Sequence, residues 1–553
     1  MNQPRKLPSA PNQPDRRAFI AGTVASAAAA SSAFANHPAA STNRPMSIDP
    51  EKPSFELSEL SIDQLQEQIK SGEASSRSLV DKYSERIEQI DDQLRSVIEL
   101  NPDARAIAEE MDRERSAGHS RGPLHGIPVM VKDNIDSADK MKTAAGSLAL
   151  VDAPTPREDS FVVQQLRSAG AVLLGKTNLS EWANIRSRHS SSGWSGRGGQ
   201  TNNPYALDRN PCGSSSGSGV AVSASLCAVA VGTETDGSVL CPSSCCGLVG
   251  IKPTVGLVGR TGIIPISHSQ DTAGPMARSV RDASILLGAL VGVDPQDKAT
   301  TAANNHFHRD YTRFLDDAGL KGAKIGVARN FFGFHDGVDS AIAAALEVLR
   351  GEGATLTDTE SLAITEEATD PEWTVLKYEL KHDMAAYLSR RGEASPMKTL
   401  QDLIAFNERH KDREMPFFGQ DTFIEAEEKG PLTEYEYVEA RAKCLRLTRT
   451  EGIDAALEQH GFDCFVAPTM SLPCLTDLVN GDHWLGFSTS PAAISGYPSI
   501  TVPAGYVSGL PVGMSFFGTA WSEPTLIKLA YAFEQASRVR QPPRFLPTLP
   551  LPA

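Results

Sequence analysis

Short apolar runs typical of buried strands alternate with helical patterns along most of this 553-residue chain. The strand-like runs lie at 126–132, 171–177, 228–233 and 323–328. Such alternation favours an α/β fold in which helices cover both faces of one large sheet. No Pro-, Gly- or Ser-rich linker interrupts the pattern, so we predict a single domain over residues 56–545.

Short sequence patterns predict the position of individual helices. Ser61 and Gln64 fit a capping box for a helix that runs to Lys70. The segment NLSEWA, residues 178–183, is predicted to be helical. Residues 355–450 are more charged and show no obvious strand, so we expect a helical insertion near the substrate pocket.

The N-terminus carries an export pattern. Arg16 and Arg17 precede an alanine-rich stretch that ends in a small-x-small sequence at 33–35. This pattern predicts a twin-arginine signal peptide over residues 1–35, followed by a linker over 36–55. The alternatives are a frayed helix or an uncleaved anchor, although the stretch is shorter than the ~20 apolar residues of a membrane span. We therefore expect an exported, periplasmic protein without stable membrane insertion, and cleavage of the signal is left open.

Charge and cysteine content exclude some classes of partner. The chain has 53 Lys and Arg against 68 Asp and Glu, a net charge of −15. This balance disfavours nucleic acid, whose binding is driven by cationic surface. Eight cysteines occur, but neither paired CxxC units nor HExxH, so we expect buried thiols, no metal and no cofactor. The oligomeric state cannot be inferred from the sequence.

Lys132 ends the apolar run GIPVMVK, residues 126–132. A lysine at this place either reaches solvent, which is the ordinary outcome, or lies in the interior with hydrogen-bond partners. A buried lysine loses its proton more readily, because burial disfavours the charged form. Such a lysine can act as a base.

Two segments offer nucleophiles. They are PCGSSSGSG, residues 211–219, and GTETDGSVLCPSS, residues 232–244, in which Ser238 follows a strand-like run. GSSSG also fits a nucleophile elbow centred on Ser215, but that motif requires a preceding strand, and the preceding residues read as loop. SHSQD, residues 267–271, holds Ser, His and Asp, yet neighbours on one short segment rarely assemble a triad, so His268 is interpreted as structural.

Together these segments resemble the amidase signature family. The resemblance extends to KPTVGLV, QDTAGPMARSV, APTMSLP and GYPSITVPAGYVSGLPVGMSFFG, and covers most of residues 57–540. It implies a large mixed β-sheet between helices. SGWSGRGGQTNNPY and TETDGS are closest to the bacterial peptide amidases, which remove the C-terminal amide of peptides.

The resemblance also implies roles for named residues. Lys132 would be the base, Ser238 the nucleophile, and Ser214, after a cis peptide bond, the serine between them. The oxyanion hole would consist of the backbone amides of Thr235, Asp236, Gly237 and Ser238. The chain departs from the family at Asp236, where glycine is usual, and at Leu240, where arginine is usual. These departures leave the substrate open, and the Asp236 side chain is expected to order its turn.

Three functions are compatible with the sequence. The first is an exported hydrolase that releases ammonia from peptide amides or small amides through an acyl-enzyme. The second is the glutamine-hydrolysing subunit of a tRNA-dependent amidotransferase, which shares the implied triad but works beside cytoplasmic partners. The third is a binding protein without activity. The export segment and the three matching triad positions favour the first.

Overall fold

The computed structural model describes residues 55–359, 362 and 365–550. The predicted signal peptide and linker, residues 1–35 and 36–55, lie outside the described residues except for Phe55.

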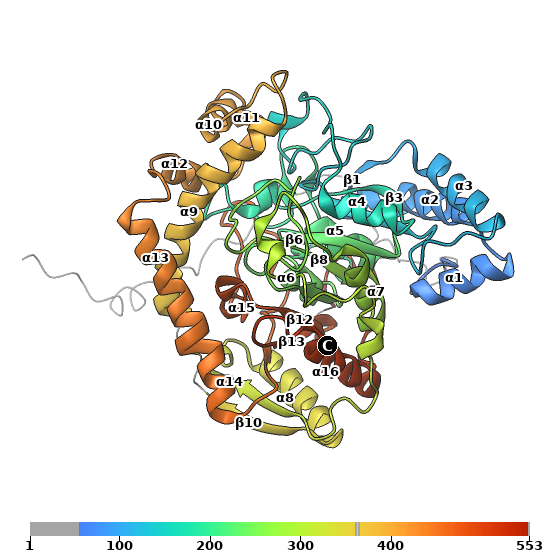
Figure 1. Ribbon diagram of the computed structural model, residues 1–553, viewed down its shortest axis with the longest axis vertical. Helices are drawn as coiled ribbons and strands as arrows, with labels where there is room; N and C mark the ends of the chain where they lie inside the picture. Colours follow the sequence, from blue (N-terminus) through green and yellow to red (C-terminus); the bar gives the residue numbers. More distant parts are fainter. Residues whose placement is uncertain (1–54, 360–361, 363–364, 551–553) are drawn as a thin grey trace, which may run out of the picture. The chain divides into compact units, whose positions relative to one another are not determined.

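The described residues form an 11-stranded sheet at the centre of the fold (Figure 1). In spatial order its strands are β1 (Val97–Leu100), β3 (Val172–Thr177), β2 (Pro128–Lys132), β6 (Val229–Glu234), β8 (Thr272–Ala277), β7 (Val249–Lys252), β12 (Ser499–Val507), β13 (Leu510–Phe517), β11 (Cys464–Pro468), β9 (Lys324–Ala328) and β10 (Thr355–Thr359). Strand β2 is parallel to both β3 and β6, and β9 is parallel to both β10 and β11. The strands between these groups pair antiparallel, so the sheet is mixed, as the sequence and its resemblance predict.

Helices pack on both faces of this sheet, while α9 to α13 pack mainly against one another beside it. The helices of the described residues are α1 (Ile62–Ser71), α2 (Ser76–Leu94), α3 (Ala104–Ser116), α4 (Phe161–Ser168), α5 (Ser216–Ser223), α6 (Leu240–Cys245), α7 (Val280–Leu290), α8 (Asp336–Gly351), α9 (Thr365–Arg390), α10 (Leu400–Arg409), α11 (Lys411–Glu414), α12 (Asp421–Glu427), α13 (Tyr435–Leu445), α14 (Asp454–His460), α15 (Ser490–Ser495) and α16 (Glu523–Ser537). Successive residues of β13 show the two faces, because side chains alternate along a strand. Phe516 packs in the cluster that contains Phe533 of α16, and Phe517 packs in another that contains Ile453.

The first helix has the predicted cap. Ser61 Oγ accepts from the Gln64 amide at 3.2 Å, and Gln64 Oε1 accepts from the Ser61 amide at 2.8 Å. Gly72 ends the helix in the left-handed conformation at φ 82°. The amides of Ser61 and Gln64 are therefore satisfied by this capping box, and the Ile62 amide donates to Asp282 at 3.1 Å.

We expect Ser61→Ala to weaken this end of the protein, because one first-turn amide loses its acceptor. The loss is about 1 kcal/mol, so amides in the first turn of α1 should exchange hydrogen roughly fivefold faster. Hydrogen exchange with peptide mapping measures this, and Ser61→Asp, which keeps a capping oxygen, is the control. Equal exchange in Ser61→Ala and the unsubstituted protein would contradict the role of the cap.

Two local predictions are wrong. Residues 355–450 begin with a strand, β10, and become helical only from α9 onward. The segment 178–183 does not form the predicted helix: Glu181–Asn184 is a short 3-10 turn in which Trp182 and Ala183 have left-handed φ values of 51° and 54°. This turn places the Glu181 carboxylate beside the buried Arg186 guanidinium, at 2.7 Å.

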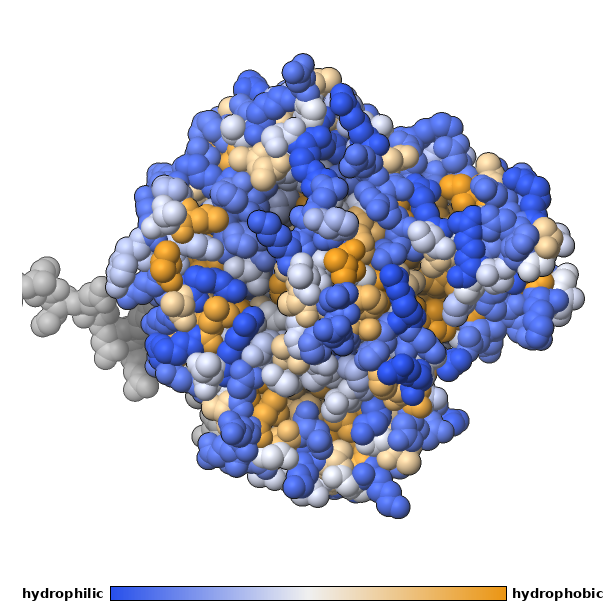
Figure 2. Space-filling view, viewed as in Figure 1, coloured by the Kyte–Doolittle hydropathy of each residue, from blue (hydrophilic) through white to orange (hydrophobic). Residues whose placement is uncertain are grey.

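The surface on the face drawn in Figure 2 is largely hydrophilic, with hydrophobic residues in separate patches. Among the described residues, no helix combines the length and apolar character needed to cross a bilayer.

Candidate active site

Strand β2 delivers Lys132 into the interior. All five residues of β2 are buried, because β3 and β6 flank it. The Lys132 side chain is 0% exposed, so it does not reach solvent. Its Nζ lies 2.8 Å from Ser214 Oγ, 2.9 Å from Thr233 Oγ1 and 3.2 Å from the Thr233 carbonyl oxygen.

The surroundings of Lys132 favour its neutral form. Burial lowers the pKa of Lys132 to about 7, and the carboxylates of Asp271 and Glu234 oppose this shift. An amine with this pKa exchanges protons near neutral pH, whereas an ordinary lysine stays protonated. The nitrogen can therefore accept a proton from the Ser214 hydroxyl with which it is in contact.

The loop before α5 presents Ser214 to this lysine. The Gly213–Ser214 peptide bond is cis, and Ser214 is fully buried. A β-carbon on Gly213 would lie 2.1 Å from Ser180 Oγ, so a larger residue here would force the Ser180 hydroxyl to move.

Ser215 has a different environment. Its Oγ donates to the Thr233 carbonyl at 3.0 Å and accepts from the Thr233 amide at 3.2 Å. No strand runs directly into residue 215, and its hydroxyl is engaged with the backbone of β6. The nucleophile-elbow alternative is therefore wrong. Ser215 instead connects the loop before α5 to strand β6 through these two hydrogen bonds.

Ser238 lies in the turn between β6 and α6. It is 8% exposed and lines a pocket, and its carbonyl accepts from the Ser215 amide at 3.1 Å. Gly237 has φ +75°, which favours glycine, and a β-carbon there would meet Cys241 Sγ at 2.8 Å. Among the described residues, the amides of Asp236, Gly237 and Ser238 donate to no protein acceptor.

Asp236 holds this turn from the other side. Its two carboxylate oxygens accept from Thr489 Oγ1 and Ser490 Oγ, each at 2.6 Å. Burial raises the pKa of Asp236. Burial also raises the pKa of Glu372, and the nearby Asp236 raises it further. Both carboxyl groups therefore hold protons more strongly than exposed acids do.

The pocket in front of Ser238 encloses about 760 Å³. Its lining includes Gly213, Thr235 and Asp236, which belong to the loop before α5 and the turn before α6. It also includes a set of apolar residues: Ile185, Ile266, Phe331, Trp373, Leu376, Met470, Trp484 and Phe487. The pocket can thus bury an apolar group while a polar one lies at Ser238.

Residues 266–271 connect the site to α9. Thr235 Oγ1 donates to Asp271 at 2.6 Å, and the same carboxylate accepts from the amides of Ile266 and Ser267. Ser267 Oγ donates to Glu379, and His268 Nδ1 faces Asp383 at 2.8 Å. His268 Nδ1 faces Asp383 and not Asp271, and Ser267 Oγ donates to Glu379 and not to His268, so the Ser, His and Asp of SHSQD form no triad. The hydrogen-bonding contact of His268 agrees with its interpretation from the sequence.

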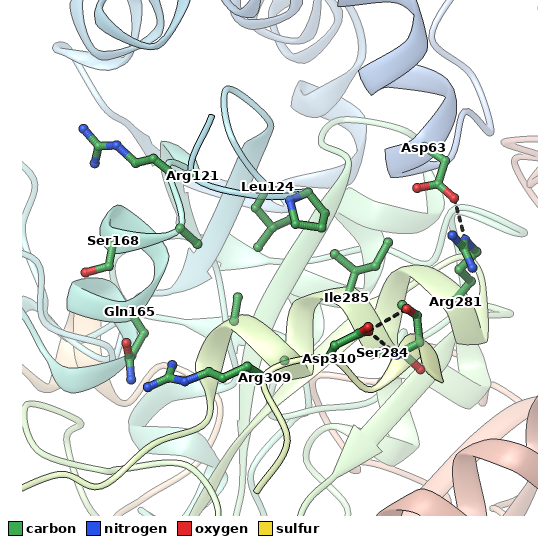
Figure 3. Close-up of a pocket in the computed structure, with 15 residues that line it drawn as sticks. Asp63, Arg121, Leu124, Gln165, Ser168, Arg281, Ser284, Ile285, Arg309 and Asp310 are labelled. Atoms are coloured by element: carbon green, nitrogen blue, oxygen red, sulfur yellow. Dashed lines mark hydrogen bonds and ion pairs between the residues drawn. The ribbon is translucent and has the colours of Figure 1, made fainter. Parts of the chain in front are cut away.

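A second cavity, of about 480 Å³, lies among α1, α4 and α7 (Figure 3). Its arginines are largely neutralised: Arg281 pairs with Asp63, and Arg121 pairs with Glu114. Ser284 Oγ, which faces it, donates to the Val280 carbonyl of its own helix. The cavity contains none of the residues around Lys132, so we do not assign the chemistry to it.

Comparisons with known proteins agree on one group of relatives. The sequence model of the family described as Amidase matches residues 78–527. A probable amidase of Arabidopsis thaliana is 41% identical over 501 residues, 89% of this chain and 93% of its own length. The crystal structure of native peptide amidase from Stenotrophomonas maltophilia has a TM-score of 0.84 and 49% identity, covering 89% of this chain and 99% of that one. A glutamyl-tRNA(Gln) amidotransferase subunit of Carboxydothermus hydrogenoformans is less similar, at 33% identity over 87% of this chain and 98% of its own length.

Proposed function

This chain belongs to the amidase family and is an amide hydrolase, and on that premise we propose that it releases ammonia from C-terminal peptide amides or small amides through an acyl-enzyme on Ser238. The observation that carries the proposal is the fully buried Lys132 amine at 2.8 Å from Ser214 Oγ, in the loop whose next amide contacts Ser238. A serine hydroxyl needs such a base to become a nucleophile.

The proposed reaction uses one proton path in both directions. Ser238 Oγ attacks the carboxamide carbon, while its proton passes to Ser214 and the Ser214 proton passes to Lys132 Nζ. The path then reverses: the proton reaches the departing nitrogen, the C–N bond breaks, and ammonia leaves. Water attacks the acyl-enzyme by the same path, and the C–O bond to Ser238 breaks to release the carboxylic acid.

The proposed oxyanion hole is the turn at 235–238. The carbonyl oxygen of the substrate becomes negative when Ser238 attacks, and amide donors already aimed at it stabilise that charge. The free amides of Asp236, Gly237 and Ser238 support this role, with Thr235 as the fourth candidate. Asp236 supports it indirectly, because Thr489 and Ser490 fix its side chain.

The proposed substrate class follows from the pocket and the comparisons. The apolar pocket walls suit the side chains of a short peptide, and the peptide amidase of Stenotrophomonas maltophilia covers nearly the same length of chain. The glutamine-hydrolysing role within an amidotransferase is the second candidate, but the lower identity of that relative gives it less support.

Ammonia release distinguishes these candidates. We expect the purified chain alone to release ammonia from a C-terminally amidated dipeptide and not from glutamine. The same dipeptide with a free carboxylate is the control for background ammonia. Release from glutamine alone would reject the peptide-amide proposal and favour the amidotransferase role.

We also propose export through the twin-arginine signal at residues 1–35, which rests on the sequence alone. N-terminal sequencing of the protein from a periplasmic fraction tests it, and a purely cytoplasmic protein would reject it.

A further inference from the structure

Two histidines and an aspartate meet where residues 266–271 contact α9. Asp383 lies between the two rings: its Oδ2 is 2.8 Å from His268 Nδ1 and its Oδ1 is 2.9 Å from His382 Nδ1. One donor atom from each residue lies within 4.8 Å of the other two. The His268 and His382 side chains are 45% and 59% exposed, so a solvated ion can reach them.

We propose that His268, His382 and Asp383 bind one divalent transition-metal ion, for which Zn²⁺ is the best match. Two imidazole nitrogens and a carboxylate suit Zn²⁺, Ni²⁺ or Cu²⁺, whereas Mg²⁺ and Ca²⁺ prefer oxygen ligands alone. Tetrahedral Zn²⁺ with bonds of ~2.0–2.1 Å needs donors about 3.3 Å apart. Two of the donor separations, 2.8 and 2.9 Å, are somewhat shorter than this value, and the third is at most 4.8 Å. Small rotations of the two half-exposed rings would then give three ligands, with water as the fourth.

The residues that contact the three proposed ligands are of the kind found around the ligands of known metal sites. A histidine bound to metal through one nitrogen commonly donates its other ring N–H to a carboxylate. In His268, Nδ1 points to Asp383 and Nε2 lies 3.3 Å from Glu379 Oε1, an ion-pair contact that puts a carboxylate beside the second ring nitrogen. Asp383 Oδ2 is in turn hydrogen-bonded by the His268 backbone amide at 2.9 Å.

Glu379 is firmly held for this role. It is fully buried and accepts from Ser267 Oγ, from the amide and Oγ of Ser269, and from Tyr437 Oη. All its protein partners donate to it, as they would to a carboxylate. The charges of Asp383 and Glu379 together then balance one divalent cation beside two neutral imidazoles.

Such an ion would join the helical insertion to the sheet. His382 and Asp383 belong to α9, which lines the substrate pocket through Glu372 and Trp373. His268 belongs to the segment that reaches Thr235 through Asp271. The site is separate from the proton path at Lys132, so we expect it to stabilise the pocket wall and not to take part in bond cleavage.

The test is a metal titration of the full chain without an affinity tag, after treatment with a chelator. We expect one equivalent of Co²⁺ to bind with the visible absorption of a low-coordinate site, Zn²⁺ to displace it, and Zn²⁺ to raise the melting temperature. The His382 ring contacts Asp383 and the His268 ring, so His382→Ala should weaken Co²⁺ binding at least tenfold while ammonia release continues. His119→Ala, at another exposed histidine, is the matched control.

Glu379→Gln keeps all three ligands and tests the groups behind them, with an expected loss of about 10- to 100-fold in metal affinity. Absence of Co²⁺ absorption in the unsubstituted protein would overturn the proposal. Unchanged binding in both His382→Ala and His268→Gln would also overturn it, because the ion would then bind elsewhere. None of these outcomes depends on the proposed amide substrate.

Discussion

Ser238→Ala is expected to abolish amide hydrolysis. In a serine protease, removal of the nucleophile lowers kcat by about 10⁶-fold, and we expect a loss of that order here. The substitution should leave the fold intact, since the Ser238 hydroxyl makes no hydrogen bond among the described residues and only its carbonyl contacts the Ser215 amide. Ammonia release over long incubations, with circular dichroism for the fold, measures both effects.

A neighbouring serine provides the matched control for this variant. Ser243 is fully buried in α6, and within the described part of the chain its Oγ has no hydrogen-bond partner. Ser243→Ala should therefore keep its activity. A fluorophosphonate probe should label the unsubstituted protein and Ser243→Ala, but not Ser238→Ala. Turnover by Ser238→Ala at the ordinary rate would reject Ser238 as the nucleophile.

Lys132→Met is expected to lower kcat by several orders of magnitude, because general-base catalysis alone contributes about 10²–10⁴-fold. Methionine has a similar length, so it fills the buried space without a base. Lys176→Met is the comparison: Lys176 is also fully buried, but its Nζ contacts Thr143 Oγ1 rather than a proposed catalytic serine. Comparable losses of kcat in both variants, at equal folded fraction, would argue against a base role for Lys132. Ser214→Ala should resemble Lys132→Met.

The pH dependence follows from the same group. Only unprotonated Lys132 can accept a proton, and its pKa is about 7, so kcat/KM should rise with pH and reach half its maximum near pH 7. Between pH values of about 7 and 10.5, Lys132 carries a proton in the unfolded chain, where its pKa is the ordinary one, but has lost it in the folded chain. Stability should therefore rise with pH across that window, and Lys132→Met should remove this contribution.

The parts of the fold that were predicted correctly are those where burial leaves a local signature. Strands β3, β6 and β9 are runs of apolar residues, because neighbouring strands and helices cover them. Strand β10 leaves no such signature because it is an edge strand: of its residues TLTDT, three are exposed and only the last is buried. The turn at 181–184 has no local signal either, because its left-handed residues satisfy distant contacts, such as the hydrogen bond from the Trp182 amide to Ala145.

The residues of the active site also fall into two groups, those that a local sequence motif marks and those that only the fold brings to the site. Short sequence motifs contain Lys132, Ser214 and Ser238, so these residues can be predicted. In the structure Lys132 Nζ contacts Ser214 Oγ, and the amide of the next residue, Ser215, contacts the Ser238 carbonyl. Thr233, which contacts Lys132 Nζ, precedes Ser238 in the same motif, but its residue type does not distinguish it from an ordinary strand threonine. Thr489, Ser490 and Glu372 reach the site from more than a hundred residues away, and no local pattern marks them.

The cysteines have a consequence for the lifetime of the protein. All eight are free thiols, and seven of them are buried, so no covalent cross-link secures the folded chain. Once unfolded in an oxidising medium, the chain would offer eight thiols for mismatched disulfides, and refolding would be blocked. Its durability outside the cytoplasm would then be set by how slowly it opens, and a chain that folds before export would meet the oxidant with most of its thiols already out of reach.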